Sequence, residues 1–244
     1  MNTGSPRRAA LIPAAMLGLA LCAPAMAAPE DPWEGFNRSI YRFNDTVDRY
    51  AVKPVAQAYQ TVTPKPVDNA ISHFFDNLAS PITLVNQLLQ GKPAAAIATT
   101  ARLMWNSTLG LGGLFDVATR MGLPREKEDF GQTLAVWGVH SGPYLMLPVF
   151  GPSTVRDAFG RVVDIAPDPR SYINSTPALA GTALDLIDTR ADLLSAEQVI
   201  EGDRYQFIRD YYLQQRKFAI ADGQIEGDEF LDESADDSSG KSGE

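Results

Sequence analysis

Apolar residues recur at spacings of three and four along most of this chain, a pattern that predicts amphipathic helices. The pattern is clearest near the N-terminus, where Asp-Pro-Trp-Glu at residues 31–34 resembles a helix start with a capping box and an early proline. The apolar face that follows consists of Trp33, Phe36, Ile40, Phe43, Val47 and Tyr50. Charged residues lie largely elsewhere, so one side of this helix is apolar.

A second apolar face ends before Ser80-Pro81 and consists of Val67, Ile71, Phe74, Phe75 and Leu78. Because proline disrupts a helix interior, the sequence predicts that one helix ends there and another begins. That next helix and the later ones are predicted over residues 81–90, 92–106, 153–163, 177–194 and 204–221. Strand alternation is scarce and no internal repeat is found. The predicted fold class is therefore all-α, in a single domain.

Three windows of the chain carry no Asp, Glu, Lys or Arg, namely residues 77–91, 103–115 and 130–155. None is a transmembrane helix, because crossing the hydrocarbon takes about 20 continuous apolar helical residues and glycines and prolines interrupt these windows. Two interpretations remain open. The windows form the buried core of a soluble helical protein, or they belong to a protein that lies in one leaflet with its apolar faces against acyl chains.

The N-terminus has the features of a secretory signal peptide over residues 1–27. Two arginines precede an apolar run at residues 9–21, and Ala25-Met26-Ala27 offers small residues for cleavage after Ala27. Cys22 provides an alternative, lipidation as in a lipoprotein, although Leu21 stands where Gly, Ala or Ser is usual. Cleavage after Ala27 leaves no cysteine, which excludes disulfides and thiol catalysis.

Composition and charge fit one large folded body with an acidic tail. The chain has 244 residues, of which 45% are hydrophobic and 21% charged, and its net charge is −9. Residues 222–244 hold nine acidic residues against one lysine, so this tail is predicted to be disordered. The body is mildly acidic and has no basic stripe, which argues against nucleic acid as a partner.

No motif in the sequence indicates catalysis, a metal or a cofactor. His73 and His140 are the only histidines and lack ligand spacing. Gly138 and Gly142 stand at the wrong distances from Ser141 for a nucleophile elbow, so a secreted serine hydrolase is a weak alternative. The GLGG stretch at residues 110–113 lacks the lysine and the spacing of phosphate-binding loops. We therefore predict a protein that is not an enzyme.

Four long stretches resemble, in order, the motifs of the MlaA (VacJ) family. They are DPWEGFNRSIYRFND (31–45), NSTLGLGGLFDVA (106–118), DFGQTLAVWGVHSGPYLMLPVFGPSTVRDAFG (129–160) and RYQFIRDYYLQQRKFAIADG (204–223). The resemblance implies that residues 28–221 form a ring-shaped domain of amphipathic helices around a central channel. It places this domain in the inner leaflet of the Gram-negative outer membrane, facing the periplasm.

The activity that this resemblance implies is the removal of mislocalised phospholipids from the outer leaflet. The lipids pass through the amphipathic channel to a soluble periplasmic carrier, which maintains lipid asymmetry, and a trimeric porin is the expected membrane partner. The sequence departs from the family pattern at Leu21 and at His140-Ser141. The alternatives from other classes are a soluble periplasmic lipid carrier and an envelope scaffold.

Two candidate sites follow from these expectations. A lipid-contacting channel loop is predicted to comprise Leu109, Gly110, Leu111, Gly112, Gly113, Leu114 and Phe115. A membrane-interface helix is predicted to present Trp33, Phe36, Ile40 and Phe43. The alternative for the loop is a glycine-rich turn packed beneath a helix. Arg156 and Asp157 are expected either to form a polar pair near the headgroup path or to cap a helix.

Overall fold

A computed structural model describes residues 31–173, 175–194 and 202–224. Over these ranges the fold is all-α apart from one short hairpin, which confirms the predicted class. The predicted signal peptide, Ala27, Cys22 and most of the acidic tail lie outside the described residues. The elements are α1 (Glu34–Val47), a π-helical turn (Asp48–Val52), α2 (Lys53–Val62), α3 (Lys65–Leu89), α4 (Pro93–Thr108), α5 (Val117–Arg120), α6 (Phe130–Val136), β1 (Tyr144–Leu147), β2 (Gly151–Thr154), α7 (Val155–Val163), a 3-10 turn (Pro169–Tyr172), α8 (Ser175–Asp192) and α9 (Arg204–Ile220).

The start of α1 differs from the expected capping box. The helix begins at Glu34, Trp33 occupies the N-cap position, and no side chain caps it. The carboxylate of Asp31 instead accepts hydrogen bonds from Asn37 Nδ2, at 2.7 Å, and from the Tyr205 hydroxyl. These partners are buried with Asp31, so they take the place of the helix amides that a capping residue would bind.

The predicted helix break at Ser80-Pro81 is wrong, because α3 runs continuously through Pro81. A proline inside a helix removes one backbone hydrogen bond and costs about 3 kcal/mol. The helix persists because its buried face packs against α4 and also contacts α6 and α8. Tertiary packing therefore outweighs the local preference of this residue.

The hairpin of β1 and β2 was not predicted and lies in the uncharged window at residues 130–155. The strands are antiparallel, with Tyr144 opposite Thr154 and Leu147 opposite Gly151. Helix α1 holds the outer edge of β1, since Asn37 exchanges hydrogen bonds with the backbones of Tyr144 (3.1 Å) and Met146 (2.9 Å). These side-chain contacts satisfy an edge that would otherwise be unpaired.

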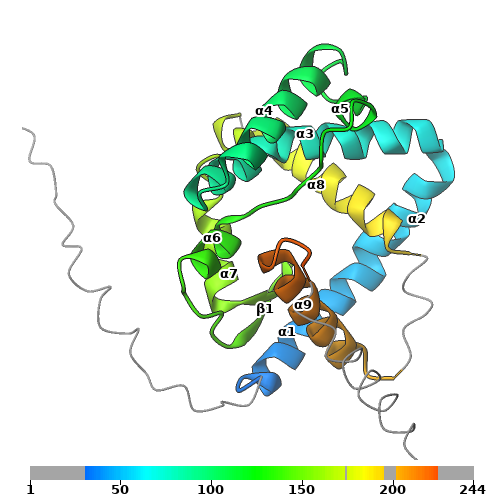
Figure 1. The fold of residues 1–244 in the computed structure, drawn as a ribbon. Helices are drawn as coiled ribbons and strands as arrows, with labels where there is room; N and C mark the ends of the chain where they lie inside the picture. The colour runs from blue at the N-terminus through cyan, green and yellow to red at the C-terminus, as the bar shows by residue number, and fades with distance from the viewer. Residues whose placement is uncertain (1–30, 174, 195–201, 225–244) are drawn as a thin grey trace, which may run out of the picture.

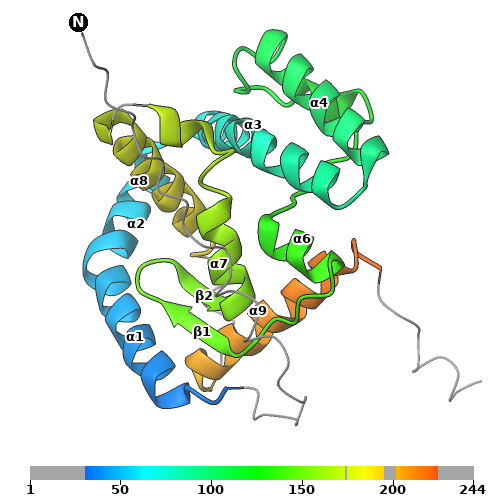
Figure 2. The ribbon, with the colours of Figure 1, turned by 90° about the vertical axis from the view of Figure 1, so that its left-hand side faces the viewer.

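The elements follow a closed path, as the views in Figures 1 and 2 show. Helices α1 and α2 form one side, α3 crosses to α6 and α7, and the hairpin returns from α7 to α1. Helix α8 contacts α2 and α3, while α9 contacts α6 and β2. The apolar core is small and consists of Tyr144, Met146 and Tyr205 with partly buried neighbours. The ring-like path agrees with expectation, and the central channel stays a prediction.

Candidate functional site

The distribution of polar and apolar side chains is the reverse of that in an ordinary water-soluble protein. Among the described residues, eighteen polar or charged residues are buried against eight apolar ones. Thirty-six large apolar side chains are exposed, and they come from all the longer helices, the hairpin tip and the loops. Large exposed apolar surfaces mark contact with a membrane or a partner, and buried polar side chains need partners of their own.

Helix α1 presents aromatic side chains outward, as predicted for a membrane-interface helix. Trp33, Phe36 and Phe43 are each about half exposed. Ile40 differs from the prediction, because it is partly buried and packs against the core of Tyr144, Met146 and Tyr205. Three of the four predicted residues therefore remain available to a membrane, and membrane contact itself stays a prediction.

The loop after α4, residues 109–115, exposes its apolar side chains to the surroundings. Leu109 is 62% exposed and Leu111 is 65% exposed, and Leu114 and Phe115 are also exposed. Gly110 and Gly113 face the protein and are buried. The exposed side chains fit the predicted lipid-contacting loop, whereas the buried glycines fit the alternative of a packed turn, so both interpretations stay open. Lipid contact by this loop remains a prediction.

Glycine is required at Gly113 for two separate reasons. Its φ is 98°, in the region that side chains rarely adopt, and it follows Leu111 and Gly112, whose φ values are also positive. A Cβ on Gly113 would lie 2.5 Å from the Asn77 Cβ, whereas a Cβ on Gly112 would meet open space. From α3, Asn77 Nδ2 donates to Ser107 Oγ (3.0 Å) and the Gly112 carbonyl (3.5 Å). The loop therefore rests directly on α3.

A buried ion pair fixes both ends of this loop. Arg102 Nη2 lies 3.0 and 2.9 Å from the two carboxylate oxygens of Asp116, and both side chains are about 90% buried. Asn106 Nδ2 donates to Asp116 Oδ1 at 3.2 Å, while Asn106 Oδ1 accepts from the Ala118 amide at 2.9 Å. The other guanidinium nitrogen, Nη1, donates to Thr119 Oγ1 at 3.1 Å and to the Leu123 carbonyl at 2.8 Å, so the side chain is fixed at both nitrogens. The loop that carries the exposed leucines is therefore held in place on both sides by hydrogen bonds.

The Asp116 carboxylate is expected to make stability depend on acid pH. Burial raises its pKa, but hydrogen bonds from Thr119, Asn106 and Arg102 outweigh burial and lower the pKa to about 2. A pKa that is lower in the folded state stabilises that state above the ordinary value near 4, and the stabilisation is lost as pH falls through about 2. The loss amounts to about 2 kcal/mol.

The measurement is the free energy of unfolding in detergent micelles between about pH 4 and pH 2, for wild type and Asp116→Asn. The substitution should remove about 2 kcal/mol of this pH dependence, whatever its constant effect on stability. Identical pH dependence in the two proteins would contradict the assignment.

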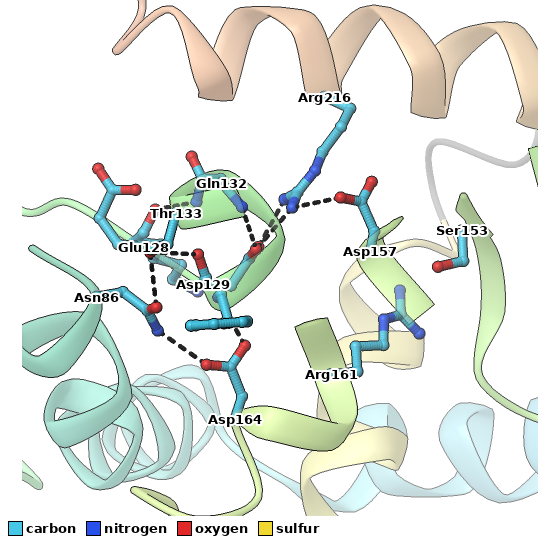
Figure 3. A network of polar contacts seen from close by, with 12 residues as sticks. Asn86, Glu128, Asp129, Gln132, Thr133, Ser153, Asp157, Arg161, Asp164 and Arg216 are labelled. Atoms are coloured by element: carbon cyan, nitrogen blue, oxygen red, sulfur yellow. Dashed lines mark hydrogen bonds and ion pairs between the residues drawn. The ribbon is translucent and has the colours of Figure 1, made fainter. Parts of the chain in front are cut away.

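A second buried network joins α6, α7 and α9 around Arg216, as Figure 3 shows. Its guanidinium donates to both carboxylate oxygens of Asp129 at 2.6 Å and to Asp157 Oδ1 at 2.9 Å. The Tyr212 hydroxyl donates to Asp157 Oδ2 at 2.8 Å. Burial raises the pKa of Asp157, but the charge and hydrogen bond of Arg216 outweigh it, so the net shift is downward.

Arg156 and Asp157 form a polar pair and do not supply the helix cap, while their nearness to a headgroup path stays a prediction. Arg156 Nε donates to Asp157 Oδ1 at 2.9 Å, and both residues are buried. The helix cap is Thr154, whose hydroxyl accepts from the Asp157 amide at 3.2 Å. Gly131 leaves room for this cluster, because a Cβ there would lie 2.4 Å from Arg216 Nη2.

The remaining polar contacts in Figure 3 connect α3 to this network. Asn86 Nδ2 donates to Asp164 Oδ1 at 2.8 Å, and the Phe130 amide donates to Asp164 Oδ2 at 2.9 Å. Burial raises the pKa of Asp164. Thr133 Oγ1 donates to Asn86 Oδ1 at 2.8 Å. Hydrogen bonds thus link α3, α6 and α7 where these helices pack together, a place that most proteins fill with apolar side chains.

A cavity of about 210 Å³, lined mostly by polar and charged residues, lies between α3, α4 and residues 125–129. Its lining includes Asn77, Thr99 and Arg102, together with Asp116 at the base of the loop. None of these side chains was predicted as a site. The one available sequence signal was that Arg102 and Asp116 are the charges that bracket the window at 103–115.

The structure adds no catalytic grouping to those weighed from the sequence. Ser141 and His140 are exposed, and the Ser141 carbonyl accepts from the Arg156 amide. No cluster of His, Cys, Asp or Glu in the described ranges has the form of a metal site. Helices long and apolar enough to cross a bilayer are also absent from these ranges.

A mostly helical fold with many exposed apolar side chains and a largely polar, hydrogen-bonded interior is typical of a protein of the membrane-interface class. The particular family follows from sequence: the MlaA lipoprotein family model matches residues 29–219, and the chain belongs to this family. That match lies within the predicted body of the protein.

Named relatives and a solved structure support the same placement. The chain is 37% identical over 206 residues to the intermembrane phospholipid transport system lipoprotein MlaA of Escherichia coli K12, covering 82% of each chain. It is 31% identical over 202 residues to the protein of that name from Haemophilus influenzae, covering 80% of this chain and 81% of that one. A structure described as "Structural basis for maintenance of bacterial outer membrane lipid asymmetry" matches with TM-score 0.70 and 38% identity, over 78% of this chain and 98% of that chain.

Proposed function

We propose that this protein removes mislocalised phospholipids from the outer leaflet of the outer membrane and passes them to a soluble periplasmic carrier. It does so without catalysis, and the outcome is maintained lipid asymmetry. The observation that carries the proposal is the inverted distribution of polar and apolar side chains, in a chain whose relatives are named for intermembrane phospholipid transport.

The chemistry of a phospholipid explains why this distribution suits the task. A headgroup moved through hydrocarbon loses its hydration at a cost of several kcal/mol, whereas the acyl tails avoid water. Transfer therefore needs a polar path beside an apolar wall. The buried networks around Arg102 and Arg216 provide polar groups within the fold, and the exposed loop leucines next to the Arg102 network provide apolar ones.

Association with the outer membrane agrees with the description of the matched structure, which concerns outer membrane lipid asymmetry. We place the protein in the inner leaflet, facing the periplasm, where exposed side chains of α1 and the loop meet acyl chains. A trimeric porin and a soluble periplasmic carrier are its proposed partners. The exposed apolar surface favours this placement over the soluble carrier, because a carrier in water would hide such side chains.

Processing of the N-terminus gives a separate prediction. We propose cleavage after Ala27, with lipidation at Cys22 as the alternative, since the family is described as a lipoprotein family. Intact-mass measurement of the protein from membranes should give a chain that starts at residue 28 without acyl groups. A chain starting at Cys22 with the added mass of acyl groups would establish the alternative.

Membrane attachment through α1 gives a test of the proposed placement. Changing Trp33, Phe36 and Phe43 together to Ser should weaken partition of the purified mature chain into phospholipid vesicles at least tenfold. The reason is that burying one such side chain contributes about 1.5–3 kcal/mol when burial is complete. Vesicle flotation measures the bound fraction.

The matched control changes three exposed polar residues of the same helix, Ser39→Ala, Arg42→Ser and Thr46→Ser. This control should bind vesicles as wild type does. Unchanged partition of the aromatic variant would rule out α1 as a membrane anchor.

A further inference from the structure

Helix α9 has an exposed aromatic face. Phe207, Tyr211 and Phe218 follow one another at spacings of four and seven residues, which places them on one side of the helix, and each is about half exposed. The rings of Phe207 and Tyr211 stack, with centroids 6.2 Å apart and planes 6° from parallel. We call these three side chains the aromatic stripe. They form an apolar surface along α9 that a partner segment gains by covering.

The chain leaves α9 on the side that carries the aromatic stripe. Asp222 and Gly223 have positive φ values of 53° and 77°, which end the helix. The Gly223 amide donates to the Phe218 carbonyl at 3.0 Å. A Cβ on Gly223 would lie 3.3 Å from Cζ of the Phe218 ring, so the backbone of Gly223 rests against the stripe.

A groove of about 550 Å³ lies at the other end of α9, where this helix begins beside α1, as Figure 2 shows. Its charged lining residues are Arg38, Arg42, Asp203 and Arg204. Arg38 already pairs with Glu34 at 2.7 Å and with Asp203 at 2.8 Å. Arg42 is exposed and donates to the Ser39 hydroxyl at 3.3 Å, and no carboxylate within the described residues pairs with it. The groove therefore offers an arginine to an acidic partner.

The segment that follows α9 in the sequence has residues suited to both surfaces. Residues 225–237 read IEGDEFLDESADD, with seven acidic residues and no Lys or Arg. Phe230 and Leu231 stand in the middle, and four of the acids come after them. A segment this acidic does not fold by itself, but such segments become ordered on a surface that complements them.

The spacing along this segment agrees with the distance between the two surfaces. Helix α9 has 17 residues, so its ends are about 26 Å apart at about 1.5 Å per residue. An extended chain advances about 3.3 Å per residue and needs about eight residues after Gln224 to span that length. Phe230 then falls level with Tyr211, and Asp232 falls level with the groove.

We propose that residues 225–237 bind back onto α9 of the same chain, with Phe230 against the aromatic stripe and the acids from Asp232 onward at Arg42. Because the segment is joined to α9, its effective concentration is on the order of 1 mM, so individually weak contacts suffice. A partner that uses the stripe must first displace the segment. The proposal rests on contacts and charges, and it does not depend on the proposed transport function.

The test is a distance measurement between two spin labels by double electron-electron resonance, in the purified chain from residue 28 in detergent micelles. This chain contains no cysteine, so labels attach only at Gln206→Cys, at the start of α9, and at Ser238→Cys, beyond the acids. The bound segment should give a narrow distribution centred below about 25 Å, whereas an unbound segment should give a broad one centred beyond about 30 Å. Adding about 1 M NaCl should broaden the narrow distribution, because salt screens the charges. A broad distribution at low salt overturns the proposal.

Two variants identify the surfaces that bind the segment. Arg42→Glu and Tyr211→Ser each change one exposed side chain, and each should broaden the distribution. Arg120→Glu is the matched control, because Arg120 is an exposed arginine on α5, outside the groove, and should keep the narrow distribution. A narrow distribution in either Arg42→Glu or Tyr211→Ser overturns the assignment.

A second copy of the chain is the other occupant that this measurement detects. Adding about a tenfold excess of unlabelled chain leaves the distances unchanged when both labels belong to one chain. We expect this result. Loss of the narrow distribution on such dilution would assign the contact to two copies and overturn binding within one chain.

Discussion

Replacing Arg216 with methionine is expected to destabilise the folded protein by about 3–5 kcal/mol. Arg216 is the shared partner of Asp129, at the start of α6, and of Asp157, near the start of α7. Methionine preserves the packing of the side-chain stem, but it leaves Asp129 without a cation and leaves Asp157 with Arg156 alone. The cost comes mainly from Asp157, which is 4% exposed, because a buried charge that loses compensation is strongly destabilising; Asp129 is 40% exposed and adds less. The fold should loosen where α9 meets α6.

The free energy of unfolding in detergent micelles, from urea titration followed by circular dichroism, measures this effect. The matched control is Lys217→Met, an exposed neighbour on the same helix, which should change stability by about 0.5 kcal/mol or less. A loss in Arg216→Met no larger than in this control would show that the network adds nothing to stability.

Replacing Gly113 with valine is expected to abolish lipid removal while the protein stays with the membrane. The new side chain meets Asn77 at 2.5 Å and forces a β-branched residue to a φ of 98°. Backbone strain of this kind costs about 1–3 kcal/mol, and the collision displaces the loop from α3. Leu111 and Leu114 then lose the position that the base of the loop gives them. The aromatic side chains of α1 are unaffected.

Outer-leaflet phospholipid in cells that carry the variant is the measure, with membrane fractionation beside it. Gly112→Asn is the matched control, because its Cβ meets open space and Asn tolerates a positive φ. Cells with Gly112→Asn should resemble wild type. Normal lipid removal by Gly113→Val would exclude a role for the loop.

The fold class and most helix positions could be predicted from the sequence, because spacings of three and four survive in a membrane-interface protein as in a soluble one. The start of α1 and the continuity of α3 could not. Asp31 has partners that are distant in sequence, and the packing of α3 overrides Pro81. The hairpin was missed for the same reason, since Asn37 and Asn44 of α1 supply part of its hydrogen bonding.

Only the apolar residues of the candidate sites could be predicted from the sequence. Leu109 and Leu111 are exposed, as a lipid-contacting loop requires, and Ile40 packs inward because hydrophobic spacing does not tell an outward face from an inward one. The buried ion pairs of Arg102 and Arg216 were not predicted. Arg102 and Asp116 are fourteen residues apart, and Arg216 is 87 residues from Asp129, so no local pattern reports either pairing.

Removal of phospholipid from the outer leaflet by this protein should be visible in the phospholipid content of that leaflet in cells without the protein, measured with an amine-reactive reagent that does not cross the membrane. We expect a rise that a plasmid copy of the wild-type gene reverses and a Gly113→Val copy does not. Unchanged outer-leaflet phospholipid in cells without the protein would contradict it.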